Sequence, residues 1–426
     1  MHFEGISSGK KAKKGNVKSY QDINRLKFKE KWEAHLQISY PKQKQDAAAK
    51  KYLPEKTIVI IDSYLPLFDR ESGSQRLYQL LNIFMDMNLH LQFVPHDGKL
   101  TEPYYHLLTS KLGIEVINKN VGQWSFRKQL ANAVRHADLL WICRPNLNKK
   151  YKYLIRFNAN IKWIYDTVDL HYIRLERQFL LSKAFNSFYK NLWLTYKIRR
   201  SKVLELSLAK QANFTIAITN VEAEILKREG IKKVWIIPNI HLPFLHETPA
   251  FSGREDLCFI GSYDHKPNVD AAYWLIDEIM PMVWRKRPEI RLYLLGNNPP
   301  PELRSRQDDR IIIPGFIEDV SNYFLKAKIF VAPLRYGAGM KGKIGQSLSF
   351  GLPIVSTSIG TEGMNLKDNI SVLEANNAAD FADKILRLYE DSELWNTIQQ
   401  HAYKTLSEYT PERIRSRLSK LFSEEI

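Results

Sequence analysis

One stretch of the sequence restricts the possible folds most strongly, FVAPLRYGAGMKGKIGQSLSFGLPIVSTSIGTEG at residues 330–363. A short apolar run leads into a glycine-rich loop, and Lys341 and Lys343 follow where a helix should begin, ahead of a second apolar run. Gly337 and Gly339 let the backbone approach a ligand closely, and the first turn of a helix offers unpaired N–H groups and partial positive charge. The pattern therefore predicts a βα unit whose loop binds a diphosphate. A solvated βα loop without a ligand is the alternative interpretation.

Short apolar runs alternate with helical patterns along most of the chain. In the first half, strands are predicted from residue 57 and at 91–94, 115–117, 139–143, 161–165, 215–218 and 234–237. In the second half, helices are predicted at 267–287, 320–327, 378–390 and 411–422. This alternation is typical of parallel sheets with helices on both faces.

The chain is expected to form more than one domain, since 426 residues are too many for a single core. The stretch PNIHLPFLHETPAFSGRED is rich in proline, shows no periodicity and separates the two α/β series. We therefore predict an α/β fold of two Rossmann-like, doubly wound domains that face each other across a cleft. The expected parts are a basic extension at 1–56, a first domain at 57–240, a linker at 241–255, a second domain at 256–405 and a C-terminal helix at 406–426.

The net charge of +17 is concentrated in two segments. Residues 1–56 contain 14 Lys and Arg against 6 Asp and Glu, and residues 174–210 contain 9 against 2. In the second segment, aromatic residues alternate with the basic ones between 185 and 200. Anionic lipid headgroups and nucleic acid both fit such patches. Because no motif of a nucleic-acid-binding protein accompanies them, we favour a membrane surface; a helix packed on the first domain with solvated basic residues is the alternative.

Other compositional features exclude several classes of protein. No run of 18 apolar residues occurs, so no segment is expected to span a membrane. Cys143 and Cys258 each lie in an apolar, strand-like run. They are predicted to be buried free thiols, and neither a disulfide nor a metal site is expected.

The second half of the chain resembles a known family. The segments FIGSYDHKPNVDAAYWLIDEIMP, RLYLLG and IPGFIEDVSNYFLKAKIF, followed by the stretch at 330–363, are similar to the C-terminal half of retaining GT-B glycosyltransferases. The family is the large bacterial polysaccharide and glycolipid family, glycosyltransferase group 1 or family 4-like. In the first half, SYLPLFDRESGSQRLYQLLNIF, WIYDTVDLHYIRLERQ and AKQANFTIAITNVEAEIL resemble the same family more loosely. The resemblance covers about residues 58–422.

The resemblance implies a nucleoside-diphosphate sugar as donor in the second domain and a lipid-linked or glycan acceptor at the first. It implies transfer with retention and without a metal or other cofactor, the departing diphosphate being neutralised by Lys341, Lys343 and the helix end. It also implies that the final helix returns to the first domain. The expected setting is bacterial cell-surface polysaccharide or glycolipid synthesis. The enzyme would be cytoplasmic, peripheral at the inner face of the cell membrane, which the basic segments contact, and no nucleic acid is expected as a partner.

Several residues of the second domain are candidates for donor binding. The resemblance places Gly261 and Lys266 near the phosphates, Phe316 at the nucleotide base and Glu362 at sugar hydroxyls. A turn glycine, a solvent-facing lysine, a core phenylalanine and a surface acid are the respective alternatives.

Gln346 departs from the family pattern. The family usually has a glutamate at this position, where it binds the ribose hydroxyls, and often a second acid at the position of Ala338. Gln346 can still hydrogen-bond a hydroxyl, but without the help of a charge. A non-catalytic relative that acts as a partner or binding subunit is therefore the alternative function.

In the first domain, two groups of residues are candidates for the site. Gly73 and Arg76 belong to a loop that should lie over the cleft and hold an anionic donor or acceptor phosphate, unless they form only a surface charge cluster. Asp166, Asp169 and His171 follow a predicted strand and should point into the cleft. His171 beside carboxylates is suited to orienting an acceptor hydroxyl, although a histidine after a strand is more often structural.

Overall fold

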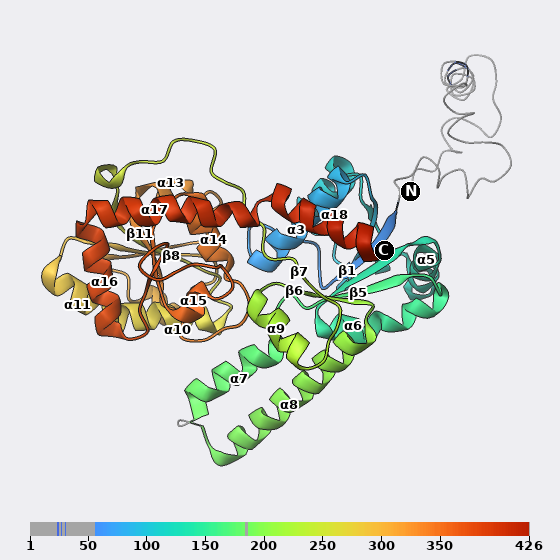
Figure 1. Ribbon diagram of the computed structural model, residues 1–426, viewed down its shortest axis with the longest axis horizontal. Helices are drawn as coiled ribbons and strands as arrows, with labels where there is room; N and C mark the ends of the chain where they lie inside the picture. Colours follow the sequence, from blue (N-terminus) through green and yellow to red (C-terminus); the bar gives the residue numbers. More distant parts are fainter. Residues whose placement is uncertain (1–23, 25–26, 28–29, 31–55, 184–185, 426) are drawn as a thin grey trace.

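The first half of the chain forms a parallel sheet of seven strands in the order β3-β2-β1-β4-β5-β6-β7. The computed structural model describes residues 24, 27, 30, 56–183 and 186–425 (Figure 1). The predicted extension at 1–56 therefore lies almost entirely outside the described residues. The strands are β1 (Thr57–Asp62), β2 (His90–Pro95), β3 (Glu115–Val116), β4 (Leu139–Cys143), β5 (Lys162–Asp166), β6 (Phe214–Ala217) and β7 (Val234–Ile236).

Helices cover both faces of this sheet. Along β1, Ile58 and Ile60 pack into one buried cluster, whereas Val59 and Ile61 pack into the cluster on the opposite face, as the two-residue period of a strand requires. The helices are α3 (Ser72–Asp86), α4 (Tyr104–His106), α5 (Gln123–His136), α6 (Pro145–Tyr151), α7 (His171–Ser182), α8 (Phe188–Gln211) and α9 (Asn220–Arg228), with a π-helical turn at Leu107–Lys111 and 3-10 turns at Lys119–Val121 and Lys152–Phe157.

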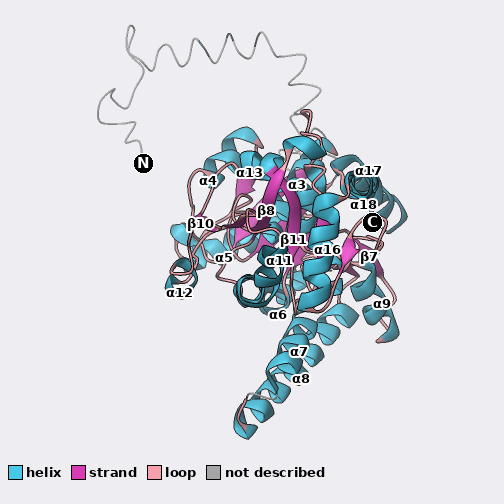
Figure 2. Cartoon of the chain, turned by 90° about the vertical axis from the view of Figure 1, so that its left-hand side faces the viewer, coloured by secondary structure: helices cyan, strands magenta, loops and turns pink. Residues whose placement is uncertain are grey.

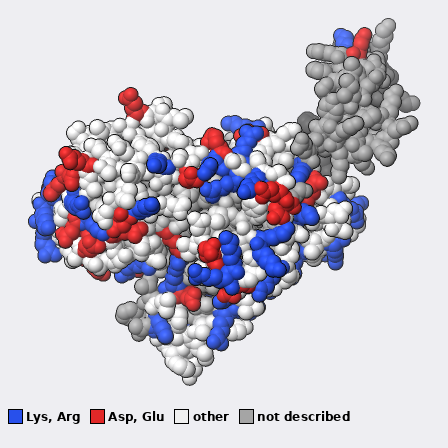
Figure 3. All heavy atoms as spheres, viewed as in Figure 1, with Lys and Arg blue, Asp and Glu red and all other residues white. Residues whose placement is uncertain are grey.

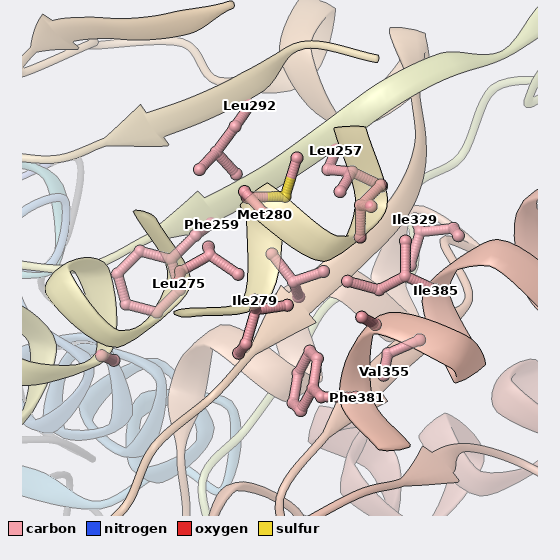
Figure 4. Packing of buried hydrophobic residues seen from close by; sticks show 14 of the residues in the cluster. Leu257, Phe259, Leu275, Ile279, Met280, Leu292, Ile329, Val355, Phe381 and Ile385 are labelled. Atoms are coloured by element: carbon pink, nitrogen blue, oxygen red, sulfur yellow. The ribbon is translucent and has the colours of Figure 1, made fainter. Parts of the chain in front are cut away.

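The second half forms a parallel sheet of six strands in the order β10-β9-β8-β11-β12-β13. Both sheets thus have the strand order of a doubly wound Rossmann-type sheet, and the predicted pair of such domains is confirmed. Figure 4 shows the core on one face of the second sheet, where Phe259, Leu292 and Ile329 pack against Met280 and Phe381. The strands are β8 (Glu255–Ile260), β9 (Leu292–Leu295), β10 (Ile311–Gly315), β11 (Ala327–Ala332), β12 (Ile354–Ser356) and β13 (Leu373–Glu374).

The helices of the second half correspond in part to those predicted. The helix expected at 267–287 is interrupted by a π-helical turn at Leu275–Ile279, which ends two residues before Pro281, a residue that cannot donate a backbone hydrogen bond. The helices are α10 (Lys266–Trp274), α11 (Met280–Lys286), α12 (Pro301–Arg304), α13 (Ser321–Lys326), α14 (Gly342–Ser349), α15 (Ser358–Thr361), α16 (Ala378–Glu390), α17 (Ser392–Leu406) and α18 (Pro411–Glu425), with 3-10 turns at Phe251–Gly253 and Ser407–Tyr409.

The last helix, α18, packs on the first domain (Figure 1). Ile414, Leu418, Leu421 and Phe422 are buried in the same cluster as residues of β1 and α3. The rings of Phe422 and Phe84 stack with their centroids 6.0 Å apart. The chain therefore crosses between the domains twice, once at 237–254 and once near Tyr409.

Helices α7 and α8 form a hairpin that projects from the first domain (Figures 1 and 2). The hairpin begins at His171, directly after the loop that follows β5. Within the described part of the chain, no helix is both long enough and apolar enough to cross a bilayer.

Candidate functional site

The candidate site lies where the loops at the carboxyl ends of both sheets meet. In the second sheet, strand order reverses between β8 and β11, and this is the position at which doubly wound domains bind ligands. The loop that follows β11 leads into α14, and Lys341 is the residue that precedes the first helical turn. The predicted strand, glycine loop and helix are thus all present.

Lys341 is largely buried, with 10% of its side chain exposed. Its Nζ donates to the carbonyl oxygen of Gly339 at 2.5 Å and lies 3.8 Å from a carboxylate oxygen of Glu362. Burial lowers the pKa of Lys341 to about 8, and the charge of Arg177 lowers it as well, whereas Glu362 opposes the shift. Glu362 is thus an ion-pair partner of this buried ammonium group, which is also suited to an anionic ligand.

Lys343 lies in the first turn of α14. Its Nζ donates to Oδ1 of Asn268 at 2.6 Å and lies 4.1 Å from the centroid of the Phe259 ring. Burial, and to a smaller degree the charge of Lys341, lowers its pKa to about 7. The two lysines therefore repel each other weakly, and burial deprives both of water. A diphosphate between them would offset the repulsion and the lost hydration.

Glycines line the ends of three adjacent strands beside Lys343. Gly261 follows β8, Gly296 follows β9, and Gly315 ends β10. A Cβ atom at Gly261 would lie 2.7 Å from the Nζ of Lys343 and equally close to Asn268. A side chain at Gly296 (φ +133°) would collide with the carbonyl of Gly261. In these three glycines, here called the glycine floor, the missing side chains at Gly261 and Gly296 make room for Lys343, Asn268 and neighbouring backbone, and only Gly315 faces open space.

Arg177 connects the hairpin to loops of the second domain. Its guanidinium donates to both carboxylate oxygens of Glu362, at 2.5 and 2.8 Å, and to the carbonyl of Gly337 at 2.8 Å. Arg177 belongs to the first domain, and both acceptors belong to the second. Burial would lower the pKa of this arginine, but the hydrogen bond to Glu362 outweighs burial and raises it.

Asp169 and His171 lie at the edge of the first domain that faces this loop. His171 Nε2 lies 2.9 Å from one carboxylate oxygen of Asp169, and Arg174 donates to the other at 2.8 Å. Burial would raise the pKa of Asp169, but the hydrogen bond from His171 and the charge of Arg174 lower it below its usual value. A Cβ atom on Gly339 would lie 3.1 Å from that of Asp169, so the structure brings these two predicted site residues together.

Two buried carboxylates hold the backbone of this loop. Glu205 accepts from the N–H groups of His171 and Tyr172, and Glu222 accepts from that of Leu170 at 3.0 Å. Burial raises the pKa of Glu222 to about 7, because few charges compensate it. Val168 adopts φ 63° in the same loop, a conformation that is rare for a β-branched residue and is typical of functional sites.

The first turns of α3 and α14 meet across the domain interface. A side chain at Gly342 would collide with Ser72, the residue before Gly73. Gly73 itself lies near Val168 and Arg144. Two helix N-termini, each with partial positive charge, thus converge beside Lys341 and Lys343.

The prediction that Arg76 lies over the cleft and holds a phosphate is wrong. Arg76 is 3% exposed, and its guanidinium donates to Asp166 at 2.8 Å and to the carbonyl of Ile237 at 2.9 and 3.1 Å. Asp166 is also buried, where it accepts from Trp141 at 3.0 Å, so it does not point outward either. Arg76 and Asp166 therefore pair with each other inside the first domain and do not contact a ligand. A buried charge is stable only when it is paired in this way.

The remaining predicted residues lie on the second domain. Phe316 is 46% exposed, so it does not belong to the core. Lys266 is exposed at the start of α10. Gln346 is half-buried on α14, one turn after Lys343, and among the described residues its side-chain amide has no hydrogen-bond partner. These three side chains are free to contact a ligand.

Sequence reasoning missed several residues of the site. They include Asn268 and Gly296 in the second domain, Arg177, and a network in which Arg144 donates to Asp62 at 2.9 Å and lies 3.9 Å from Glu71. The segment FIGSYDHKPN contains Asn268, and its resemblance to the family was the signal that was available for it. Within the described residues, no cluster of three His, Cys, Asp or Glu side chains suited to a metal ion occurs.

Comparisons with known proteins find similarity in sequence and in fold. Residues 254–391 match the family model described as glycosyl transferases group 1. A Klebsiella pneumoniae protein, described as an uncharacterized 44.6 kDa protein in the cps region, is 24% identical over an alignment of 303 residues that covers 64% of this chain and 75% of that protein.

Solved structures show the same fold at low sequence identity. Anabaena HepE in complex with UDP and glucose has a TM-score of 0.65 at 13% identity, covering 86% of this chain and 99% of that one. Sucrose-phosphate synthase from Thermosynechococcus elongatus has a TM-score of 0.64 at 14% identity, covering 87% and 98%. S. aureus TarM in complex with Fondaparinux, alpha-GlcNAc-glycerol and UDP has a TM-score of 0.63 at 12% identity, covering 87% and 100%. The chain thus has the predicted GT-B fold, and residues 254–391 in its second half are similar to the glycosyl transferases group 1 family.

Proposed function

We propose that this protein transfers a sugar from a nucleoside-diphosphate sugar to a hydroxyl acceptor. The observation that supports this most is the pair of largely desolvated lysines, Lys341 and Lys343, with pKa values lowered to about 8 and about 7, at the start of α14. A diphosphate leaving group develops negative charge at such a place, and preorganised positive charge stabilises it.

The donor would lie along the glycine floor of the second domain. Its diphosphate would contact Lys341, Lys343 and the N–H groups of α14. Gln346 would bind the ribose, exposed Phe316 would contact the base, and Glu362 would bind sugar hydroxyls. The ligands bound in two structural relatives, UDP with glucose and UDP with alpha-GlcNAc-glycerol, support a nucleotide sugar of this class.

The acceptor would approach from Asp169 and His171. We infer transfer with retention and without a metal ion, since lysines and helix ends provide the positive charge at the leaving group. No protein side chain acts as the nucleophile in this proposal. Instead, Asp169 and His171 orient the acceptor hydroxyl, whose proton passes to the departing phosphate.

The biological setting we propose is cell-surface polysaccharide or glycolipid synthesis, with a lipid-linked or glycan acceptor. The relative in the Klebsiella cps region supports a role in polysaccharide synthesis. A lipid-linked acceptor would place the enzyme at the cytoplasmic face of the cell membrane.

Thermal unfolding with a panel of nucleoside diphosphates and nucleotide sugars tests the donor. At 100 times its dissociation constant, a ligand of the folded state adds about 2.7 kcal/mol to the free energy of unfolding. We expect nucleotides with one particular base to raise the midpoint of thermal unfolding by several degrees in the wild type. The same rise is expected in Lys286→Ala, which changes an exposed lysine of the second domain, but not in Lys341→Ala/Lys343→Ala. A folded wild type that no nucleotide stabilises would contradict donor binding. Binding without turnover, with turnover gained in Gln346→Glu, would favour the non-catalytic alternative.

The affinity for a nucleotide sugar is expected to fall as pH rises above 7. The free lysines have pKa values of about 7 and about 8, and the bound diphosphate would raise both. Binding then takes up protons between the free and bound pKa values, so affinity is highest below pH 7 and falls at least about tenfold by pH 9. Calorimetry in two buffers of different ionisation enthalpy measures the proton uptake. Affinity that stays constant or rises over this range would contradict the assignment.

A further inference from the structure

The outer face of α8 presents a row of large apolar side chains, here called the α8 stripe, that no other described segment covers. Its residues recur at helical spacings of three and four, so they lie along one face. Phe188 is 76% exposed, Tyr189 81%, Trp193 57% and Tyr196 60%. The stripe comprises Phe188, Tyr189, Leu192, Trp193, Tyr196 and Val203.

The opposite face of α8 is also apolar, but it is covered. Leu194 and Ile198 are half-buried on the side turned toward α7, and Leu208 is buried in the core of the first domain. Helix α8 thus has two apolar faces, of which the hairpin covers only one. Exposed patches of this kind mark interaction sites.

Charge indicates what the stripe contacts. The 28 residues from 177 to 204 contain seven Lys and Arg and no Asp or Glu. Lys197 lies beside the stripe, with its Nζ 5.1 Å from the centroid of the Trp193 ring, and Lys190, Arg199 and Arg200 are exposed around it. Figure 3 shows the end of the hairpin as mostly white atoms, with blue basic side chains above them. Two such surfaces would repel each other, so a second copy of this chain does not fit, whereas an anionic surface does.

We propose that the α8 stripe docks the protein on an anionic phospholipid bilayer. Tyr and Trp are the side chains that favour the boundary between lipid and water, and basic residues beside them bind the headgroups. The aromatic rings lie at the level of the headgroups, and Lys190, Lys197 and Arg200 contact phosphates. The hairpin does not cross the membrane.

Docking in this way positions the site relative to the bilayer. Helix α7 has 12 residues from His171 to Ser182, a length of about 18 Å. Its first residue belongs to the proposed acceptor side, and Arg177 in its middle binds Glu362 of the donor side. If the proposed function holds, the acceptor hydroxyl stands within about one such length of the headgroups, as in a sugar linked to a membrane lipid.

Vesicle co-sedimentation of the full chain tests the proposal. The probes are vesicles of phosphatidylcholine alone and vesicles that also contain phosphatidylglycerol. Phe188→Ser/Trp193→Ser/Tyr196→Ser should bind the anionic vesicles at least tenfold more weakly than the wild type. Trp124→Ser, which changes a tryptophan on α5 that is even more exposed (76%) than Trp193, should bind like the wild type. Lys197→Glu/Arg200→Glu should weaken binding, whereas Lys149→Glu/Lys150→Glu on α6 should not.

A fluorescent probe at one position of the stripe tests the same contact without relying on sedimentation. Because Cys143 and Cys258 are both buried, Tyr189→Cys can be labelled selectively with a polarity-sensitive fluorophore. Anionic vesicles should shift its emission to the blue, and the same label at Trp124→Cys should not respond. Equal binding by the stripe variant, a silent label at position 189, or a change from dimer to monomer in the stripe variant would each overturn the proposal. Nucleotide stabilisation measured on the same variants should be unchanged, so failure of the proposed function is detected separately.

Discussion

Replacing Lys343 with alanine is expected to lower kcat/KM for sugar transfer by about 10² to 10³-fold. Its Nζ is fixed 2.6 Å from Asn268 Oδ1 and lies against the glycine floor at Gly261. A positive charge held in place before the reaction stabilises the departing diphosphate without reorganisation. Burial, which lowers its pKa to about 7, leaves little water around this ammonium group, so its attraction to a diphosphate is weakly screened.

Steady-state kinetics with the donor identified by thermal unfolding measure this effect. Most of the loss should lie in kcat, because the charge of the leaving group grows in the transition state. Lys286→Ala is the matched control, since this exposed lysine only pairs with exposed Asp383 at 3.5 Å. A Lys343→Ala variant with wild-type kcat/KM would exclude the proposed role, and an equal loss in Lys286→Ala would indicate a general effect of net charge.

The fold and the donor half of the candidate site could be predicted because their signals are local in sequence. Lys341 and Lys343 precede α14 within one contiguous strand, glycine loop and helix, and each apolar run of the two domains became a strand. Helix α17 was missed because the prediction ended the helical pattern at 390, where Asp391 caps a new helix through the N–H of Leu394. When two helices follow each other directly, a single capping residue such as Asp391 is the only sign in the sequence that one ends and the next begins.

Pairs that are distant in sequence could not be predicted. Arg76 and Asp166 are 90 residues apart and form a buried ion pair, whereas Arg177 and Glu362 are 185 residues apart and bridge the two domains. In the sequence, both arginines follow a loop near the carboxyl end of a strand and look alike. Their different roles follow from the fold. Because of the packing of α3, Arg76 lies in the core of the first domain, and because of the direction of α7, Arg177 contacts the second domain.

Replacing Arg177 with alanine is expected to lower kcat/KM by about 10- to 100-fold, the loss expected for hydrogen bonds between partly buried charged groups. Arg177 holds Glu362 at 2.5 and 2.8 Å, while Lys341 lies 3.8 Å from the same carboxylate. Without the arginine, Lys341 becomes the nearest cation to Glu362. The two would pair, and the positive charge available to the diphosphate would be reduced. The carbonyl of Gly337 would also lose the donor that fixes the loop.

A double-mutant cycle separates this role from a purely structural one. Affinity for the nucleoside diphosphate should fall in Arg177→Ala and recover in Arg177→Ala/Glu362→Ala, because the second change removes the carboxylate that captures Lys341. Turnover should not recover in the double variant if Glu362 binds sugar hydroxyls as proposed. Arg177→Lys should restore only part of the activity, since a single ammonium group cannot hold both carboxylate oxygens and a carbonyl at once. Additive losses in affinity across the cycle would mean that Arg177 acts independently of Glu362, and its part in keeping Lys341 free for the donor would then be wrong.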